Sequence, residues 1–150
     1  MVADHERWLA AEESFKAVLA EKPGISAVYI APSPDMYYVV NPAVAGDASY
    51  ARSLGLTIPD VTIDEANGTY WEYLSPEEVG KYQTDLLFVS YRATLSIEEF
   101  TAIPTVAALP AVQAGQVFEW NQDSISSYRG LADGVEGLIA AVSSSEIVTG

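Results

Sequence analysis

The stretch that decides the fold class is Thr84–Trp120, which reads TDLLFVSYRATLSIEEFTAIPTVAALPAVQAGQVFEW. Near its start, the unbroken apolar run Leu86–Val89 is too short for a helix of ordinary length, so it predicts a strand buried on both faces. Ser96 and Glu99 have the spacing of a capping box that opens a short helix. Pro104 sets the limit of that helix.

The second half of this stretch contains a further helix and a further strand. Pro110 suits a first helical position and Gly115 suits the position just past a last turn, so we expect a short helix over 111–114. Residues 116–120 then predict the next strand. A strand, two short helices and a second strand, in this order, are typical of an α/β domain.

Periodicity and stop signals place the remaining elements. Apolar residues at helical spacing predict helices, β-branched and aromatic runs predict strands, and prolines and glycines mark their ends. A second capping box, Ser75 with Glu78, opens one of the helices. Because helices and strands alternate, we predict an α/β fold, a three-layer sandwich with a mostly parallel central sheet flanked by helices. We expect helices over 4–22, 44–54, 76–82 and 128–142, and strands over 25–30, 36–40 and 61–64.

Composition excludes several classes of function. The 150 residues are enough for one domain with a sizeable core. The 21 acidic and 7 basic side chains give a net charge of −14, which repels phosphate backbones, so we expect no nucleic acid partner. The sequence has no cysteine, which excludes disulfides, thiol catalysis and thiolate metal sites.

We also predict that the protein is not an enzyme. A Ser-His-Asp triad or a histidine metal site needs a placed histidine, and the single one, His5, falls in the first turn of the first helix, where we expect it to be exposed. The sequence has no G-x-S-x-G elbow, P-loop or G-x-G-x-x-G fingerprint. A carboxylate pair for glycoside hydrolysis, such as Glu72 with Asp123, arises easily by chance among 21 acidic residues.

Arginine stands beside tyrosine at two predicted element ends. Tyr91 and Arg92 follow the buried strand, and Tyr128 and Arg129 open the last helix. Open α/β sheets bind ligands at the carboxyl ends of their strands. Arginine offers a fork of donors for carboxylate, hydroxamate or catecholate oxygens, and tyrosine offers a flat face with a polar tip. These pairs are candidates for contacts to an anionic, partly apolar ligand, and ordinary salt bridges with half-buried tyrosines are the alternative.

The segment IPTVAALPAVQAGQVFEW has an apolar residue, a proline, a short linker, a Leu-Pro-Ala-Val turn and a glycine before a strand. In this pattern, and in LGLTIPD at 54–60, the sequence resembles the C-terminal lobe of periplasmic ferric-siderophore-binding proteins. Those proteins are the substrate-binding components of ABC importers, and one long helix joins their two lobes. The residues that supply the pattern are Ile103, Pro104, Leu109, Pro110, Ala111, Val112, Gly115 and Val117.

The resemblance implies that residues 1–22 are the end of the connecting helix and residues 23–150 the C-terminal lobe. It implies binding of an iron-siderophore complex for delivery to an ABC importer, with no resident cofactor. The implied partners are the siderophore, the membrane permease and an N-terminal lobe missing from this chain. The first residues lack a signal-peptide pattern, so we expect the signal and any lipid anchor to belong to a longer, extracytoplasmic parent protein. In related importers a glutamate docks the permease, and the candidates are Glu13, Glu77, Glu78 and Glu99.

The resemblance also adds two tryptophans to the candidate site. Trp71 precedes the second capping box in what we expect to be a loop, where ferric-hydroxamate binders carry a tryptophan that can face the cleft. Trp120 ends a predicted strand near the same mouth, and core positions are the alternative for both. Tyr128 stands where the family usually has an aromatic residue. We predict a ligand-binding face, opposite the missing lobe, made of Trp71, Tyr91, Arg92, Trp120, Tyr128 and Arg129.

Two other functions stay open at this point. A cobalamin or haem carrier of the same fold fits the resemblance equally well. An interaction or scaffold domain with no small ligand is the alternative from another class.

Overall fold

The computed structural model describes residues 2–64, 66, 68–90, 92–120 and 127–149, and its centre is a five-stranded sheet. β4 pairs in parallel with both β1 and β5, whereas β2 runs antiparallel to β1 and β3. Four of the five described strands therefore point the same way, which confirms the mostly parallel sheet. The strands, in the spatial order β3-β2-β1-β4-β5, are β1 (Ala27–Pro32), β2 (Tyr37–Val40), β3 (Trp71–Leu74), β4 (Leu86–Ser90) and β5 (Val117–Trp120).

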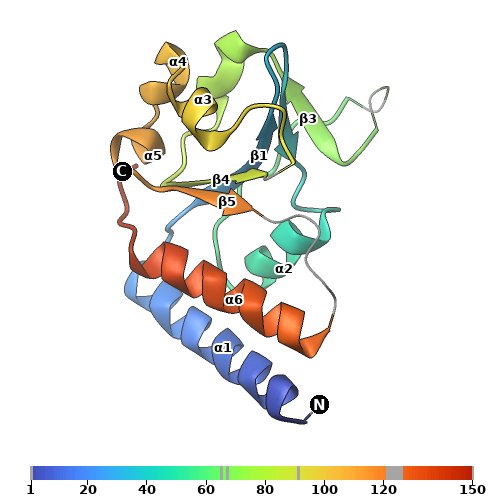
Figure 1. The fold of residues 1–150 in the computed structure, drawn as a ribbon, viewed down its shortest axis with the longest axis vertical. Coiled ribbons are helices and arrows are strands. Elements are labelled where there is room, and N and C mark those ends of the chain that lie inside the picture. The colour runs from blue at the N-terminus through green and yellow to red at the C-terminus, as the bar shows by residue number, and fades with distance from the viewer. Residues whose placement is uncertain (1, 65, 67, 91, 121–126, 150) are drawn as a thin grey trace.

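Helices cover both faces of the sheet and complete the predicted three-layer sandwich (Figure 1). One set shares a core with Tyr29 and Phe88, and the other shares a core with Val28 and Leu87. The first set is α1 (Val2–Glu21), α2 (Gly46–Ser53) and α6 (Tyr128–Ser143). The second set is the 3₁₀ helix η2 (Pro76–Lys81) with α3 (Ile97–Thr101), α4 (Pro104–Ala107) and α5 (Pro110–Gln113).

β4 is the strand predicted from the apolar run, and all five of its residues are buried. Leu86 and Phe88 face the core beneath α1 and α6, while Leu87 and Val89 face the core beneath the short helices. Because both faces are covered, apolar side chains are favoured at every position and the sequence shows no alternation. The middle of the sheet is occupied by β1, with β4 beside it.

Local signals set most element boundaries. Both predicted capping boxes form, and Gly115 adopts φ +70° just after α5. Pro104 does more than limit α3, because it also opens α4 as its first residue. The predicted strand over 61–64 was wrong. The Thr62 N–H donates to a side-chain carboxylate instead of to a neighbouring strand.

Trp71 begins β3, so the expectation that it lies in a loop was also wrong. Asn41, directly after β2, explains the difference. Its backbone N–H donates to the Tyr70 carbonyl at 2.8 Å, and its side-chain amide donates to the Thr69 carbonyl at 2.8 Å. These bonds hold the chain against β2, so that Trp71 pairs with Val40.

α1 and α6 lie side by side with their N-terminal ends at the same end of the molecule (Figure 1). Near these ends, the Arg7 guanidinium donates to Glu136 at 2.6 and 2.9 Å and to Asp133 at 2.6 Å. At the other end, Lys22 Nζ donates to three carbonyl oxygens at the C-terminal end of α6, at 2.5 to 3.1 Å. The helices are thus joined at both ends. Among the described helices, none has both the length and the apolar character to cross a bilayer.

Asp85, just before β4, ties the C-terminal residues to the sheet. It is fully buried, and its carboxylate accepts hydrogen bonds from the backbone N–H groups of Ser26, Val148 and Thr149 at 2.8, 2.8 and 2.9 Å. The hydroxyl of Thr149 donates a further bond at 2.8 Å. Burial alone would raise the pKa of Asp85, but the donors outweigh burial and lower it.

Candidate functional site

Aromatic side chains cross the sheet on the face covered by α1, α2 and α6. The strand register places Trp71 of β3 opposite Val40, Tyr29 of β1 opposite Phe88, and Phe88 opposite Phe118 of β5. Tyr29 and Phe88 stack with ring centroids 4.8 Å apart. A row of large rings therefore runs across the sheet.

A second row lies nearer the carboxyl ends of the parallel strands. Tyr73 is opposite Tyr38, Tyr38 is opposite Ala31, and Ser90 is opposite Trp120. Ala31 and Ser90 are small, so the middle of this row has room for a large neighbouring ring. The Trp120 indole can therefore lean inward from the edge strand β5.

Rings from both rows, together with Tyr70 just before β3, form what we call the aromatic cluster, defined as Tyr38, Tyr70, Trp71, Tyr73 and Trp120. The Trp71 ring centroid lies 4.6 Å from that of Tyr70, 6.1 Å from Tyr38 and 6.4 Å from Trp120. Tyr38 and Tyr73 meet edge to face at 5.0 Å. Because Tyr70 and Tyr73 are 39% and 41% exposed, the cluster presents aromatic faces to solvent.

Trp120 is the buried member of the cluster, with 5% of its surface exposed. Its indole N–H donates to Asp47 Oδ2 of α2 at 3.0 Å, and its ring meets Tyr29 edge to face at 5.1 Å. Trp120 and Trp71 belong to the two opposite edge strands of the sheet, yet their rings contact each other. Trp120 therefore combines a core position with a place in the aromatic cluster.

Arg92 is exposed in the turn after β4, at the carboxyl end of that strand. Its backbone N–H donates to the Ser90 hydroxyl at 3.2 Å. This is the position at which the sequence predicted a ligand contact. Tyr91, the other residue predicted there, lies outside the described residues.

Tyr128 and Arg129 open α6 and are exposed, but Tyr128 belongs to a different aromatic group. Its ring stacks on Trp8 of α1, with centroids 5.4 Å apart, and lies 4.5 Å from His5. The Trp8 indole N–H donates to the Tyr50 hydroxyl at 2.8 Å. Tyr128 thus marks the seam between α1 and α6.

The structure therefore brings two of the predicted site residues, Trp71 and Trp120, into contact. Arg92 lies at the end of β4, the neighbour of the strand that carries Trp120. Tyr128 and Arg129 lie at the seam. Convergence of the whole predicted set on one ligand-facing surface stays a prediction.

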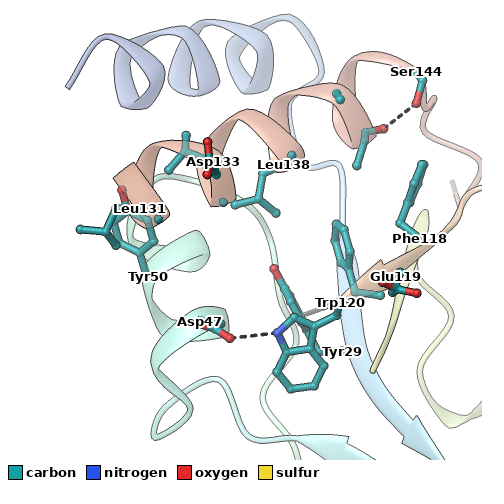
Figure 2. Close-up of a pocket in the computed structure, with 17 residues that line it drawn as sticks. Tyr29, Asp47, Tyr50, Phe118, Glu119, Trp120, Leu131, Asp133, Leu138 and Ser144 are labelled. Atoms are coloured by element: carbon teal, nitrogen blue, oxygen red, sulfur yellow. Dashed lines mark hydrogen bonds between the residues drawn. The ribbon is translucent and has the colours of Figure 1, made fainter. Parts of the chain in front are cut away.

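A cavity of about 800 Å³ lies between α6 and the sheet, beside α2 (Figure 2). The rings of Tyr29 and Trp120 contribute to its floor, and Asp47 contributes from α2. Burial, and then the nearby Asp47 charge, raise the pKa of Tyr29, so its phenol stays neutral at ordinary pH. In the described part of the chain, no three His, Cys, Asp or Glu side chains are grouped to hold a metal ion.

Glu72, one of the carboxylates considered for glycoside hydrolysis, lies on the opposite face in a closed network. It accepts hydrogen bonds from Lys81 Nζ at 2.5 Å, from the Thr62 N–H at 2.8 Å and from the Tyr82 hydroxyl. Burial would raise the pKa of Glu72, but these bonds outweigh it and lower the pKa. A buried carboxylate held ionised by three partners is structural.

Sequence reasoning missed Tyr73, and for Tyr38 it indicated only that Tyr37 and Tyr38 point to opposite faces of one strand. A usable signal existed for Tyr73. It stands two positions after Trp71, and residues two apart in a strand share a face. Once Trp71 is placed in a strand, Tyr73 joins the same surface.

Comparison with known proteins relates this geometry to a family. Residues 4–124 match the family described as periplasmic binding protein. No curated protein matches the chain. Among solved structures, the chain is similar to DesE, a ferric-siderophore receptor protein from Streptomyces coelicolor, with 28% identity and a TM-score of 0.89. The match covers 99% of this chain and 50% of DesE.

Two other structures share the fold. One is the siderophore periplasmic binding protein from the fuscachelin gene cluster of Thermobifida fusca, at 18% identity and TM-score 0.76, covering 95% of this chain and 53% of that protein. The other is PiaA of Streptococcus pneumoniae in complex with ferrichrome, at 14% identity and TM-score 0.70, covering 96% and 52%. The chain spans about half the length of these structures. It belongs to the periplasmic binding protein family and has the fold of one lobe of its ferric-siderophore-binding members.

Proposed function

We propose that this chain forms one half of the ligand cleft of an extracytoplasmic protein that binds a ferric siderophore and delivers it to an ABC importer. The observation that carries the proposal is the partly exposed aromatic cluster, on a chain 28% identical to a ferric-siderophore receptor protein. The chelate brings the metal, so the protein needs no cofactor of its own.

The chemistry of the cluster suits such a ligand. A ferric chelate is large and partly apolar, and the faces of Trp71 and Tyr73 offer flat contact surface with polar edges. Many chelates are also anionic, and the Arg92 guanidinium at the end of β4 supplies donors for their oxygens. The aromatic cluster thus provides contact area for the chelate, and Arg92 provides attraction to its negative charge.

Delivery requires a surface that meets the permease, and the exposed glutamates are the candidates. Glu78 and Glu99 already accept hydrogen bonds in the two capping boxes. Glu77 lies in the same first turn of η2, and its side chain takes no part in the capping box. Glu13 pairs with Lys16 at 3.5 Å, so we favour Glu77 for an ion pair with basic permease residues.

The test is calorimetric titration of the full-length protein with ferrioxamine B, ferrichrome, cyanocobalamin and haemin. We expect the hydroxamate chelates to bind and the other two to be rejected. Trp71→Ala and Tyr73→Ala should each weaken chelate binding about tenfold, since each removes a stacking face. Arg92→Ala should weaken an anionic chelate, for which a ferric tris-catecholate is added to the titration, by about 1.5 to 3 kcal/mol and neutral ferrichrome much less.

Leu9→Ala is the matched control, because Leu9 is 44% exposed on α1 and Tyr73 is 41% exposed. It should leave the affinity unchanged. Preferential binding of cyanocobalamin or haemin would show that the siderophore is the wrong ligand and that the protein carries one of these compounds. Absence of binding to all five compounds would favour a scaffold domain and refute the proposal.

A further inference from the structure

The cavity beneath α6 is a second candidate site, separate from the exposed side of the aromatic cluster. Its floor consists of rings from three strands, namely Tyr29, Phe88, Phe118 and Trp120. Its volume of about 800 Å³ is typical of sites for small organic molecules. Of the aromatic cluster, Trp120 alone also lines the cavity within the described residues.

The roof of the cavity is a face of α6 made of small residues. Gly130, Gly134, Gly137 and Ala141 follow one another at spacings of four, three and four, so they share one side of the helix. A Cβ atom built on Gly134 or Gly137 would meet nothing within 4 Å. Each glycine inside a helix costs about 1 kcal/mol relative to alanine. Close packing against another part of the described chain does not account for this cost at Gly134 and Gly137, and both positions leave open space above the aromatic floor.

The hydroxyl of a buried tyrosine points into the same space. Tyr29 is 3% exposed, and Figure 2 shows its oxygen directed toward the space below α6. No side-chain oxygen of the described residues is both fully buried and without a hydrogen bond, so this hydroxyl, which has no partner among those residues, opens onto the cavity that Tyr29 lines. Asp47 lines the cavity beside it, and only its Oδ2 atom is engaged by the Trp120 indole. The cavity therefore offers a phenol oxygen and a carboxylate oxygen for a ligand to use.

The charge of the lining selects the kind of ligand. Asp47, Glu119 and Asp133 line the cavity, and its described lining contains no lysine, arginine or histidine. Asp133 shares the Arg7 guanidinium with Glu136, and Glu119 alternates along β5 with the floor residues Phe118 and Trp120, so Asp47 is the carboxylate over the aromatic floor. Carboxylates and aromatic faces both attract organic cations, and they disfavour anions.

We propose that this cavity binds a small, flat, apolar amine in its protonated form. Its ring system would lie between the aromatic floor and the glycine face of α6. Its ammonium group would donate hydrogen bonds to the Asp47 carboxylate and the Tyr29 oxygen. This site takes a different ligand from the proposed siderophore site, and the two share Trp120 of the aromatic cluster.

The test compares three probes of one shape and different charge, which are 1-naphthylmethylamine, 1-naphthylmethanol and 1-naphthoate. Titrations of this chain would be followed by changes in its backbone amide NMR signals. We expect the amine to bind about tenfold more tightly than the alcohol, and the carboxylate to give no saturable change up to about 1 mM. The shifted signals should belong to α6, α2 and β1.

Variants test each part of the proposed cavity site. Tyr29→Phe and Asp47→Asn should each weaken amine binding several-fold while the fold is kept, because both keep the size of the side chain. Gly134→Leu combined with Gly137→Leu fills the space below α6 and should abolish binding without lowering stability. Tyr73→Ala, which changes the aromatic cluster outside the cavity, should leave amine binding unchanged.

Three results would overturn the proposal. These are equal binding of all three probes, no binding of the amine at about 1 mM, or full binding by the folded double leucine variant. Since the Tyr73→Ala variant reports on the siderophore proposal alone, failure of either proposal is recognised separately.

Discussion

Asp85 shows how much one side chain organises. Its buried carboxylate joins the start of β4, the residue before β1 and the end of the chain through Ser26, Val148 and Thr149. Asp85→Asn keeps the shape but turns an acceptor into a donor against N–H groups. We expect a loss of about 2 to 3 kcal/mol in the free energy of unfolding, measured by urea denaturation at pH 7. The exposed Asp60→Asn should change it by less than about 1 kcal/mol.

The pH dependence of this contribution follows from the lowered pKa of Asp85. A carboxyl whose pKa is lower in the folded state stabilises the fold above its unfolded pKa of about 3.9. The stabilisation is lost as the pH falls through the folded value. Below about pH 4, the unsubstituted chain should therefore lose free energy of unfolding more steeply than the Asp85→Asn variant. Parallel curves of unfolding free energy against pH would contradict this role.

Some residue roles could not be predicted from the sequence. Ser26, Val148 and Thr149 stand about sixty residues from Asp85, and the Trp120 indole finds Asp47 at a distance of 73 residues. No local pattern encodes such contacts. Trp71 could be proposed from the aromatic residues beside it in the sequence. Its contact with Trp120 could not, because that contact depends on two small residues, Ala31 and Ser90, in the intervening strands.

At the scale of elements, Lys22 caps the C-terminal end of α6 from just past the last turn of α1. Lys22→Met keeps the apolar stem and removes the donors and charge that complement the helix dipole. We expect the free energy of unfolding, measured by thermal denaturation, to fall by about 1 kcal/mol. Amide hydrogen exchange in the last turn of α6 should become faster. Lys16→Met is the matched control, because Lys16 pairs on the surface with Glu13 at 3.5 Å. Equal effects of the two substitutions would show that the hydrogen bonds of Lys22 to the end of α6 add no stability beyond that of a surface lysine.

Elements with strong local signals were predicted well. β4, α6 and both capping boxes follow from an apolar run, a helical period and fixed spacings. The failures came where pairing overrode local pattern. Trp71 was drawn into β3 by the hydrogen bonds of Asn41, and 61–64 was kept out of the sheet when Thr62 bonded to Glu72.

At the scale of the whole molecule, half a cleft should bind poorly. If this chain supplies one of two ligand-binding lobes, it loses about half of the contacts while the fixed cost of association, roughly 4 to 15 kcal/mol, stays the same. We expect calorimetry to give a dissociation constant above about 10 μM for ferrioxamine B with this chain, and a far lower one for the full-length protein. Submicromolar binding by this chain alone would contradict the two-lobe mechanism.

The contact between the two edge strands also has an optical consequence. The indoles of Trp71 and Trp120 lie 6.4 Å apart at an angle of 62°, close enough for their electronic transitions to couple. Two coupled chromophores held at a skew angle split their absorption into circular dichroism bands of opposite sign. Trp8 of α1, which donates a hydrogen bond to Tyr50, makes no ring contact with this pair among the described residues. The circular dichroism of this tryptophan pair therefore reports on the distance and angle between β3 and β5. A change in the curvature of the sheet would alter the two bands.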